Sequence, residues 1–173
     1  MTKKIRSVSN TCIIMLVSIG INYMGKVLAA DWHLPLWMDS IGTGMSACLL
    51  GPFFGALCGA TNNILYGMRN VTSYAYAFTS VAIAIVMGIC MRRHMIRDWF
   101  GVFTTSALVS AVAVIVSTPF NLIFFQGYNG NLWGDALFDM FRYYRIPVVI
   151  ASGLSELLVD FPDKVVTVCI IFG

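Results

Sequence analysis

Long uncharged stretches, separated by short polar or charged segments, set the pattern of this chain. A first apolar run covers residues 11–25 and resumes after Lys26, which makes it long enough to cross a membrane as a helix. Further uncharged windows cover residues 40–68, 70–91, 99–134 and 165–173. The pattern therefore predicts helices of membrane-spanning length rather than the alternating polarity of half-buried strands.

The window 40–68 is too long for one helix and too short for two long ones. Gly51-Pro52 divides it, because proline cannot continue a helix and disfavours helical geometry in the preceding residue. We expect a tight hairpin of two short helices, 36–50 and 53–66, followed by helices at about 74–91 and 99–125 and a last helix that starts near Pro162. Glycines at every fourth position (Gly51, Gly55, Gly59) predict close helix packing.

The segment 126–160 combines turn residues with six charges. Apolar side chains at positions 137, 141 and 144 share one face of a helical turn, which predicts short helices that lie at the outer membrane interface and cap the bundle. In a seven-helix alternative, residues 146–159 cross the membrane. Glu156 and Asp160 interrupt that stretch and disfavour the alternative.

Composition strengthens the membrane interpretation. The 173 residues are 58% hydrophobic and 11% charged, with a mean hydropathy of +0.80, whereas soluble domains carry about 25% charged residues. We therefore expect an all-α, polytopic membrane protein of about six transmembrane helices, forming a single domain over residues 1–173. The five cysteines show no CxxC spacing, so no metal site is expected.

The positive charges predict the orientation. One cluster (Lys3, Lys4, Arg6) precedes the first helix, and a second (Arg92, Arg93, Arg97, beside His94) follows the fourth helix. In a six-helix path both lie on one side, and the positive-inside rule makes that side cytoplasmic. A multi-pass protein of the cell membrane with a cytoplasmic N-terminus follows. The last apolar run reaches Gly173, so either the final helix is very short or the sequence is part of a longer one.

Several polar residues interrupt the apolar spans, where a central charge costs roughly 2.5–3.5 kcal/mol. Lys26 either extends to the headgroups or lines a pocket, and Asp39 either offsets a helix dipole or pairs with Lys26. Hydrogen bonds between helices explain any single asparagine better than a pocket does, but they do not explain why the polar residues share one half of the membrane. These residues all fall in the outer half, which predicts an outward-facing pocket. The candidates from this reasoning are Asn22, Lys26, Asp39, Asn62, Asn63, Tyr66, Arg69 and Asn121.

The mixed charges of these candidates, together with the tyrosines, permit a flat, hydrogen-bonding ligand with an acidic group. Enzyme signatures do not compete with this interpretation, since the chain has no GxSxG, HExxH, P-loop or GxGxxG pattern. The two histidines, His33 and His94, fall in loops on opposite faces. We therefore predict no catalytic residue, no cofactor and no nucleic-acid partner.

The stretch LPLWMDSIGTGMSACLLGPFFGALCGATNNILYG resembles the S components of energy-coupling factor (ECF) transporters, which have an aspartate, an I-G-T run, a G-P-x-x-G-A-x-x-G hairpin and a terminal asparagine. The later VDFPDKVVTV, with Asp-Lys heading the last helix, is similar to the same group. The resemblance implies a six-helix subunit that binds a vitamin or other micronutrient from outside. It implies partners as well: a transmembrane coupling subunit and two cytoplasmic ATPases.

The resemblance also implies that outer loops form the substrate site, which adds Trp37 and Tyr128 to Asp39, Asn63 and Arg69. The family's AxxxA-like docking motif on helix 1 is missing, and only Ser18 with Asn22, or Gly25 with Ala29, have that spacing. Related six-helix modules also occur as sensory N-terminal domains of signalling proteins. A membrane-embedded sensory domain is therefore the alternative function.

Overall fold

The computed structural model describes residues 8–172, and every regular element in that range is helical, as the all-α expectation requires. The N-terminal charge cluster Lys3, Lys4 and Arg6 lies outside the described residues. The elements in chain order are α1 (Val8–Asp31), α2 (Ile41–Leu49), α3 (Pro52–Gly67), η1 (Val71–Tyr74), α4 (Ala77–Arg92), α5 (Trp99–Phe125), α6 (Leu132–Tyr143) and α7 (Val148–Phe172).

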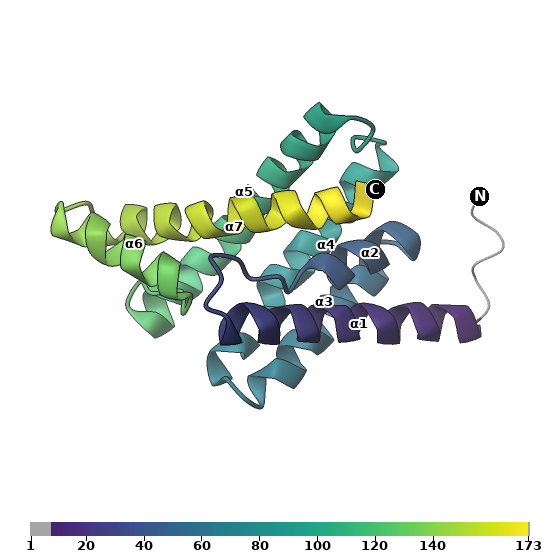
Figure 1. Ribbon diagram of the computed structural model, residues 1–173, viewed down its shortest axis with the longest axis horizontal. Helices are drawn as coiled ribbons and strands as arrows, with labels where there is room; N and C mark the ends of the chain where they lie inside the picture. The colour runs from purple at the N-terminus through teal and green to yellow at the C-terminus, as the bar shows by residue number, and fades with distance from the viewer. Residues whose placement is uncertain (1–7, 173) are drawn as a thin grey trace.

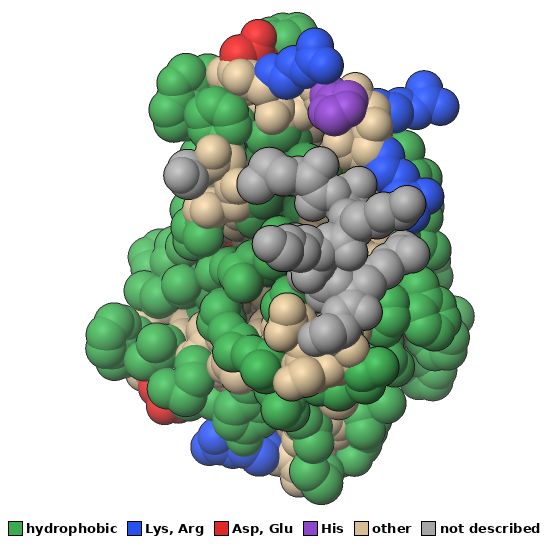
Figure 2. Space-filling view, turned by 90° about the vertical axis from the view of Figure 1, so that its right-hand side faces the viewer, with side chains coloured by type: hydrophobic (Ala, Val, Ile, Leu, Met, Phe, Trp, Pro, Cys, Tyr) green, Lys and Arg blue, Asp and Glu red, His purple; other side chains and the backbone are tan. Residues whose placement is uncertain are grey.

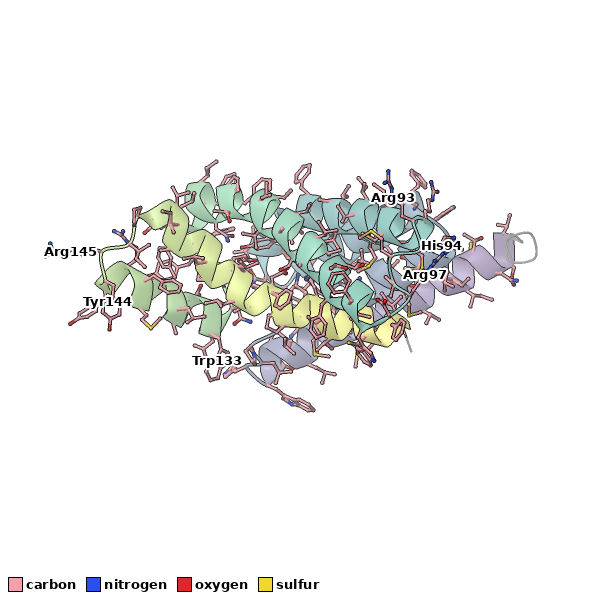
Figure 3. All side chains as sticks on the ribbon, turned by 90° about the horizontal axis from the view of Figure 1, so that it is seen from above. Arg93, His94, Arg97, Trp133, Tyr144 and Arg145 are labelled. Carbon is pink, nitrogen blue, oxygen red and sulfur yellow. The ribbon has the colours of Figure 1, made fainter. Side chains whose placement is uncertain are left out.

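The helices form an elongated bundle in which α1 begins, and α7 ends, toward the same end (Figure 1). Arg93, His94 and Arg97, in the loop after α4, lie toward that end as well, whereas Tyr144 and Arg145 lie at the opposite end (Figure 3). The bundle is held by packing of α3 on α4 and of α5 on α7. We call the end that carries Arg93 the basic end and the opposite end the outer end.

The predicted helical hairpin is present. Gly51 turns it with a φ of 105°, a left-handed conformation that suits glycine, and Pro52 opens α3. A Cβ added at Gly55 would lie 2.6 Å from the Ala47 Cβ, and one at Gly59 would lie 2.7 Å from the Ser80 Cβ. The glycines therefore let α3 pack closely against α2 and α4, as their spacing predicted.

The first arm of the hairpin is shorter than expected, because α2 begins at Ile41 rather than at residue 36. The preceding residues form a loop whose backbone is held from another helix. The Asp163 Oδ1 of α7 accepts hydrogen bonds from the Trp37 and Met38 N–H groups at 3.1 and 2.7 Å. This long-range contact replaces the helical hydrogen bonds that local sequence would have favoured.

The prediction for the C-terminal third is wrong in part. One amphipathic helix, α6, does cap the outer end, but the last helix does not start near Pro162. Instead α7 runs unbroken from Val148 to Phe172 and contains Pro162 in its interior. Glu156 and Asp160, which were expected to interrupt a helix, are 4% and 3% exposed and face the bundle interior.

Two helices, α1 with 24 residues and α5 with 27, are long and apolar enough to cross a membrane, and α4 is a shorter apolar helix. The helix α7 has comparable length at 25 residues but carries four charges in its middle. Much of the face shown in Figure 2 is hydrophobic, and basic side chains gather toward its upper part. These features agree with a membrane protein at the level of individual helices.

Candidate functional site

A cavity of about 380 Å³, which we call the outer cavity, opens beside the loops that join α1 to α2, α3 to α4 and α5 to α6. It is enclosed by the last turns of α1, the loop after α1, the region around η1, and the loop that leads into α6. Its size falls in the range of small-molecule sites. Its walls include Lys26, Trp37, Tyr66, Tyr76 and Asp135.

Lys26 is the charged centre of this cavity's floor. Its Nζ donates hydrogen bonds to Asp39 Oδ2 at 3.1 Å, Asn63 Oδ1 at 2.7 Å and Ser73 Oγ at 2.9 Å, which uses all three ammonium protons. The same nitrogen lies 5.0 Å from the centroid of the Tyr66 ring. The pairing with Asp39 that the sequence indicated as one alternative is therefore confirmed, and Lys26 does not extend to the surface, being 8% exposed.

Asn63 fixes the position of this lysine. Its amide nitrogen donates to Ser80 Oγ at 2.6 Å on α4, while its amide oxygen accepts from both Lys26 and Ser73. The side chain thus links α1, α3, η1 and α4 at one point. Because adjacent residues on a helix point about 100° apart, only one of Asn62 and Asn63 can take this role.

Two nearby lysines keep the carboxyl group of Asp39 ionised. Asp39 lies in the loop before α2. Burial acts to raise the pKa of its carboxyl group, but the charges of Lys26 and Lys164 outweigh that effect, so its pKa lies below the ordinary value. Asp39 is therefore ionised at neutral pH. The Lys26–Asp39 contact is an ion pair rather than a neutral hydrogen bond.

A smaller inner cavity of about 30 Å³ lies behind the first. It shares Lys26, Trp37 and Tyr76 with the outer cavity, so these three residues form the boundary between the two. The walls of the inner cavity add hydroxyl, carboxylate and ammonium groups. These further polar residues are Asp39, Thr79, Ser80, Glu156, Asp160 and Lys164.

Lys164 organises the charges at the inner cavity. Its Nζ, 1% exposed, contacts Asp160 Oδ1 at 2.8 Å and Asp163 Oδ2 at 2.7 Å. Asp160 also accepts a hydrogen bond from Ser110 of α5 at 2.8 Å. Asp163 meanwhile holds the backbone of the loop at Trp37. The cluster ties α7 to α5 and to the loop that lines the outer cavity.

A chain of hydrogen bonds connects the inner cavity to the loop before α6. Asn121 of α5 donates its amide N–H to Glu156 Oε2 at 3.2 Å, and its amide oxygen accepts the Tyr76 hydroxyl proton at 2.6 Å. The Tyr76 hydroxyl also lies 3.1 Å from the Asn129 carbonyl oxygen. Pro119, two residues before Asn121, remains inside α5 without ending it.

The outer rim is joined by contacts between distant loops. The side chain of Asn131 accepts from the Trp133 and Gly134 N–H groups, which caps α6, and donates to the Leu34 carbonyl oxygen at 3.1 Å. The Trp133 indole N–H donates to the His33 carbonyl oxygen at 2.8 Å. The loop after α1 and the start of α6 therefore form one connected rim.

The sequence-predicted residues fall into three groups. Lys26, Trp37, Asp39 and Tyr66 line the cavities. Asn63 and Asn121 hold lining residues by hydrogen bonds. The remaining four lie outside both linings: Asn22, Asn62, Arg69 and Tyr128.

Each member of the third group has a different environment. Asn22 joins α1 to α2 by accepting the Gly42 N–H at 2.6 Å. Asn62 is fully buried, and its amide has no partner within the described part of the chain. Arg69 is exposed near Tyr23. Tyr128 donates to Asp139 at 2.7 Å, a hydrogen bond that raises the pKa of its hydroxyl group.

Sequence reasoning missed the acidic and basic side chains of α7. Glu156, Asp160, Asp163 and Lys164 recur at intervals of three and four, the spacing that places side chains on one helix face. That signal was present in the sequence. It was interpreted as a break between helices because the partners that bury these charges lie on other elements.

The arrangement is suited to binding, because buried donors and acceptors surround two adjacent cavities. Among residues 8–172, no group of three or more His, Cys, Asp or Glu side chains has the arrangement needed to hold a metal ion. Comparison of the chain with protein-family models, with characterised proteins and with solved structures finds no match.

Proposed function

We propose that this chain is a polytopic membrane protein that binds a small molecule in the outer cavity. The observation that carries the proposal is a cavity of about 380 Å³ beneath three outer loops, with a charged floor at Lys26 and Asp39. Such a floor is costly to bury in a helix bundle, and ligand sites are the usual place for intramembrane charges. The role is binding rather than catalysis.

In this proposal six segments cross the membrane, namely α1, α2 together with the loop before it, α3, α4, α5 and α7, while α6 lies at the outer interface. The apolar α1 and α5 support it. So does the separation of Arg93, His94 and Arg97 from Trp133, which follows the lining residue Leu132 (Figure 3). The exposed basic loop after α4 makes its side cytoplasmic by the positive-inside rule. The protein then resides in the cell membrane with its N-terminus inside.

The more specific proposal is the substrate-binding S component of an ECF transporter for a micronutrient. The resemblance of the hairpin sequence supports it, together with the position of Asp39 and Lys164 at the cavities. Its partners would be a transmembrane coupling subunit and cytoplasmic ATPases. The protein would deliver its ligand inward only with those partners.

The first experiment is a thermal-shift screen of the purified, detergent-solubilised chain against vitamins and related micronutrients. We expect one compound to raise the melting temperature and to give a 1:1 complex by native mass spectrometry. Trp37→Ala should weaken its binding about tenfold or more, since this ring lines both cavities. Trp99→Ala is the matched control, because Trp99 is 63% exposed at the start of α5.

Equal loss of affinity in the two tryptophan variants would refute the location of the site. The transporter assignment has a separate test, which is purification of the tagged chain from its own cells in mild detergent. We expect a coupling subunit and ATPase subunits to co-purify. Recovery of a kinase, phosphatase or cyclase on the same polypeptide instead would replace the transporter assignment with the sensory alternative.

A further inference from the structure

The carboxyl groups around the inner cavity outnumber the ammonium groups. Lys26 is paired with Asp39, and Lys164 is paired with Asp160 and Asp163. Two lysines therefore face these three aspartates and a fourth carboxylate, that of Glu156. Glu156 takes part in none of the ion pairs found within residues 8–172. The side chains that act on it as hydrogen-bond donors are the neutral amides of Asn121 and Asn129.

A buried carboxylate without a cationic partner is unfavourable, so Glu156 holds a proton unless a cation from outside the chain lies beside it and takes the place of that proton. Glu156 is 4% exposed and lines the inner cavity, whose volume of about 30 Å³ exceeds that of one water-sized probe. The space beside this carboxylate is therefore large enough to admit an ammonium group.

A second observation points to a ligand in the same place. Thr79 is 8% exposed and lines the inner cavity, and its hydroxyl group has no hydrogen-bond partner among the described residues. The indole N–H of Trp37, at the boundary of the two cavities, is likewise buried without a partner in that part of the chain. Buried polar groups are normally satisfied, so these two mark a place where a polar molecule completes the bonding.

Aromatic rings lie at the boundary between the two cavities. The Trp37 and Tyr76 rings, 6.3 Å apart, border both cavities, and the Phe125 ring stacks on Tyr76 with 6.2 Å between the ring centroids. The faces of such rings attract cations, most strongly where water is excluded. The outer cavity adds the carboxylate of Asp135 to its wall. Among the described lining residues, both lysines, Lys26 and Lys164, are already bonded to carboxylates, so an anionic ligand meets no unpaired ammonium group in either cavity.

We propose that the ligand carries a cationic nitrogen, which enters the inner cavity beside Glu156 while its flat body lies against Trp37 and Tyr76 in the outer cavity. This inference rests on the proposed small-molecule site and names the chemical class of its ligand. It reverses the expectation of an acidic ligand that was drawn from the mixed charges of Lys26, Arg69 and Asp39. Arg69 lies outside both linings, and Lys26 is occupied by Asp39.

The test compares three probes of one shape and different charge: phenethylamine, 2-phenylethanol and phenylacetate. Their binding to the purified chain is measured by melting temperature and by native mass spectrometry, at one ionic strength. We expect phenethylamine to bind about tenfold or more tightly than phenylacetate, with the alcohol between them. Sodium and potassium chloride are run alone to detect an inorganic cation at the same position.

Glu156→Gln removes the carboxylate and keeps the shape, so it should lower phenethylamine affinity to that of the alcohol and leave alcohol binding unchanged. Asp31→Asn is the matched control, because it removes one negative charge from an exposed residue that lines neither cavity. Unchanged amine preference in Glu156→Gln overturns the inference. If that variant does not fold, the order of the three probes on the natural chain decides the question.

Tighter binding of phenylacetate, or equal binding of all three probes, overturns the cationic ligand but leaves a small-molecule site in place. Stabilisation by sodium or potassium without any preference for the amine likewise overturns it, in favour of an inorganic cation. Failure of all three probes to bind overturns the inference, whereas the proposed function is decided separately by the micronutrient screen and the two tryptophan variants.

Discussion

Replacing Lys164 with methionine should destabilise the fold more than any change at an exposed residue. Methionine keeps the length and apolar stem of lysine but removes the charge, so Asp160 and Asp163 lose their contacts at 2.8 and 2.7 Å. Removing one partner of a buried ion pair costs about 3–5 kcal/mol, because the remaining charge stays desolvated. We expect a loss of that size in the free energy of unfolding.

A compensated triple variant, Lys164→Met with Asp160→Asn and Asp163→Asn, separates charge from packing. The asparagine at position 163 still offers a side-chain oxygen to the Trp37 and Met38 N–H groups. Because neutral replacements of a whole buried charge cluster are often tolerated, the triple variant should regain more than half of the lost stability. Arg93→Met, at an exposed position, should change it by no more than about 0.5 kcal/mol.

The assay is reversible unfolding in mixed micelles with increasing SDS, followed by tryptophan fluorescence. A Lys164→Met variant within about 1 kcal/mol of the natural chain would refute the reasoning, since that is the range of a solvent-exposed pair. A triple variant no more stable than the single one would also refute it. In that case the lysine would act through packing rather than through its charge.

Three further predictions concern helix packing, pH and the rim. Gly55→Leu should prevent close packing of α3 on α2 and lower the melting temperature, since a Cβ at position 55 would lie 2.6 Å from the Ala47 Cβ. Gly20→Ala is the control, because position 20 has open space around it, and it should raise the stability by up to about 1 kcal/mol. Because the pKa of Asp39 is lowered in the fold, its ion pair stabilises the protein above about pH 4, and this stabilisation is lost as the pH falls further. The melting temperature of Asp39→Asn should therefore depend less on pH in that range than the melting temperature of the natural chain. Parallel pH profiles of the two proteins would refute the ion pair. Asn131→Ala removes the cap of α6 and the hydrogen bond to the Leu34 carbonyl oxygen, so the stability should fall by about 1–2 kcal/mol and proteolysis of the loops around the outer cavity should become faster. An unchanged digestion pattern would contradict the conclusion that Asn131 holds these loops together.

The sequence predicted best those elements whose ends carry local signals. The range expected for the fifth helix agrees with α5 at both ends, where Asp98 caps the N-terminus and Gln126 adopts a left-handed conformation. The hairpin followed from Gly51-Pro52 and from the glycine spacing, because these residues act on their immediate neighbours. The pairing of Lys26 with Asp39 was also within reach, since both residues were placed at the outer end.

The prediction failed where distant residues decide the structure. Glu156 and Asp160 were interpreted as an interruption because charges in an apolar run usually mark a boundary. In the fold they are buried beside Asn121 and Ser110 of α5, so the helix continues through them. The loop before α2 is a second case, because its conformation depends on Asp163, more than 120 residues later in the chain.

The candidate site also contains residues that a local sequence signal identifies and residues that only distant contacts bring in. Asn63 and Lys26 were identified because polar residues in apolar spans are conspicuous. Tyr76 and Ser73 were missed because hydroxyl groups near a helix start are common and give no such signal. Arg69 was included for its charge, but the structure turns it toward Tyr23 and outside both cavities. Charge alone therefore identifies candidates, and tertiary contacts decide which of them meet.

The central claim is that a small molecule occupies the outer cavity, and native mass spectrometry of the chain extracted from its own membrane tests it most directly. Ala30→Trp places an indole in the cavity, while Met24→Trp places one on an exposed part of the same helix that lines neither cavity. The account predicts one bound molecule per chain on the natural protein and on Met24→Trp, and none on Ala30→Trp. The same bound mass on Ala30→Trp, or no bound molecule on any of the three, would contradict it.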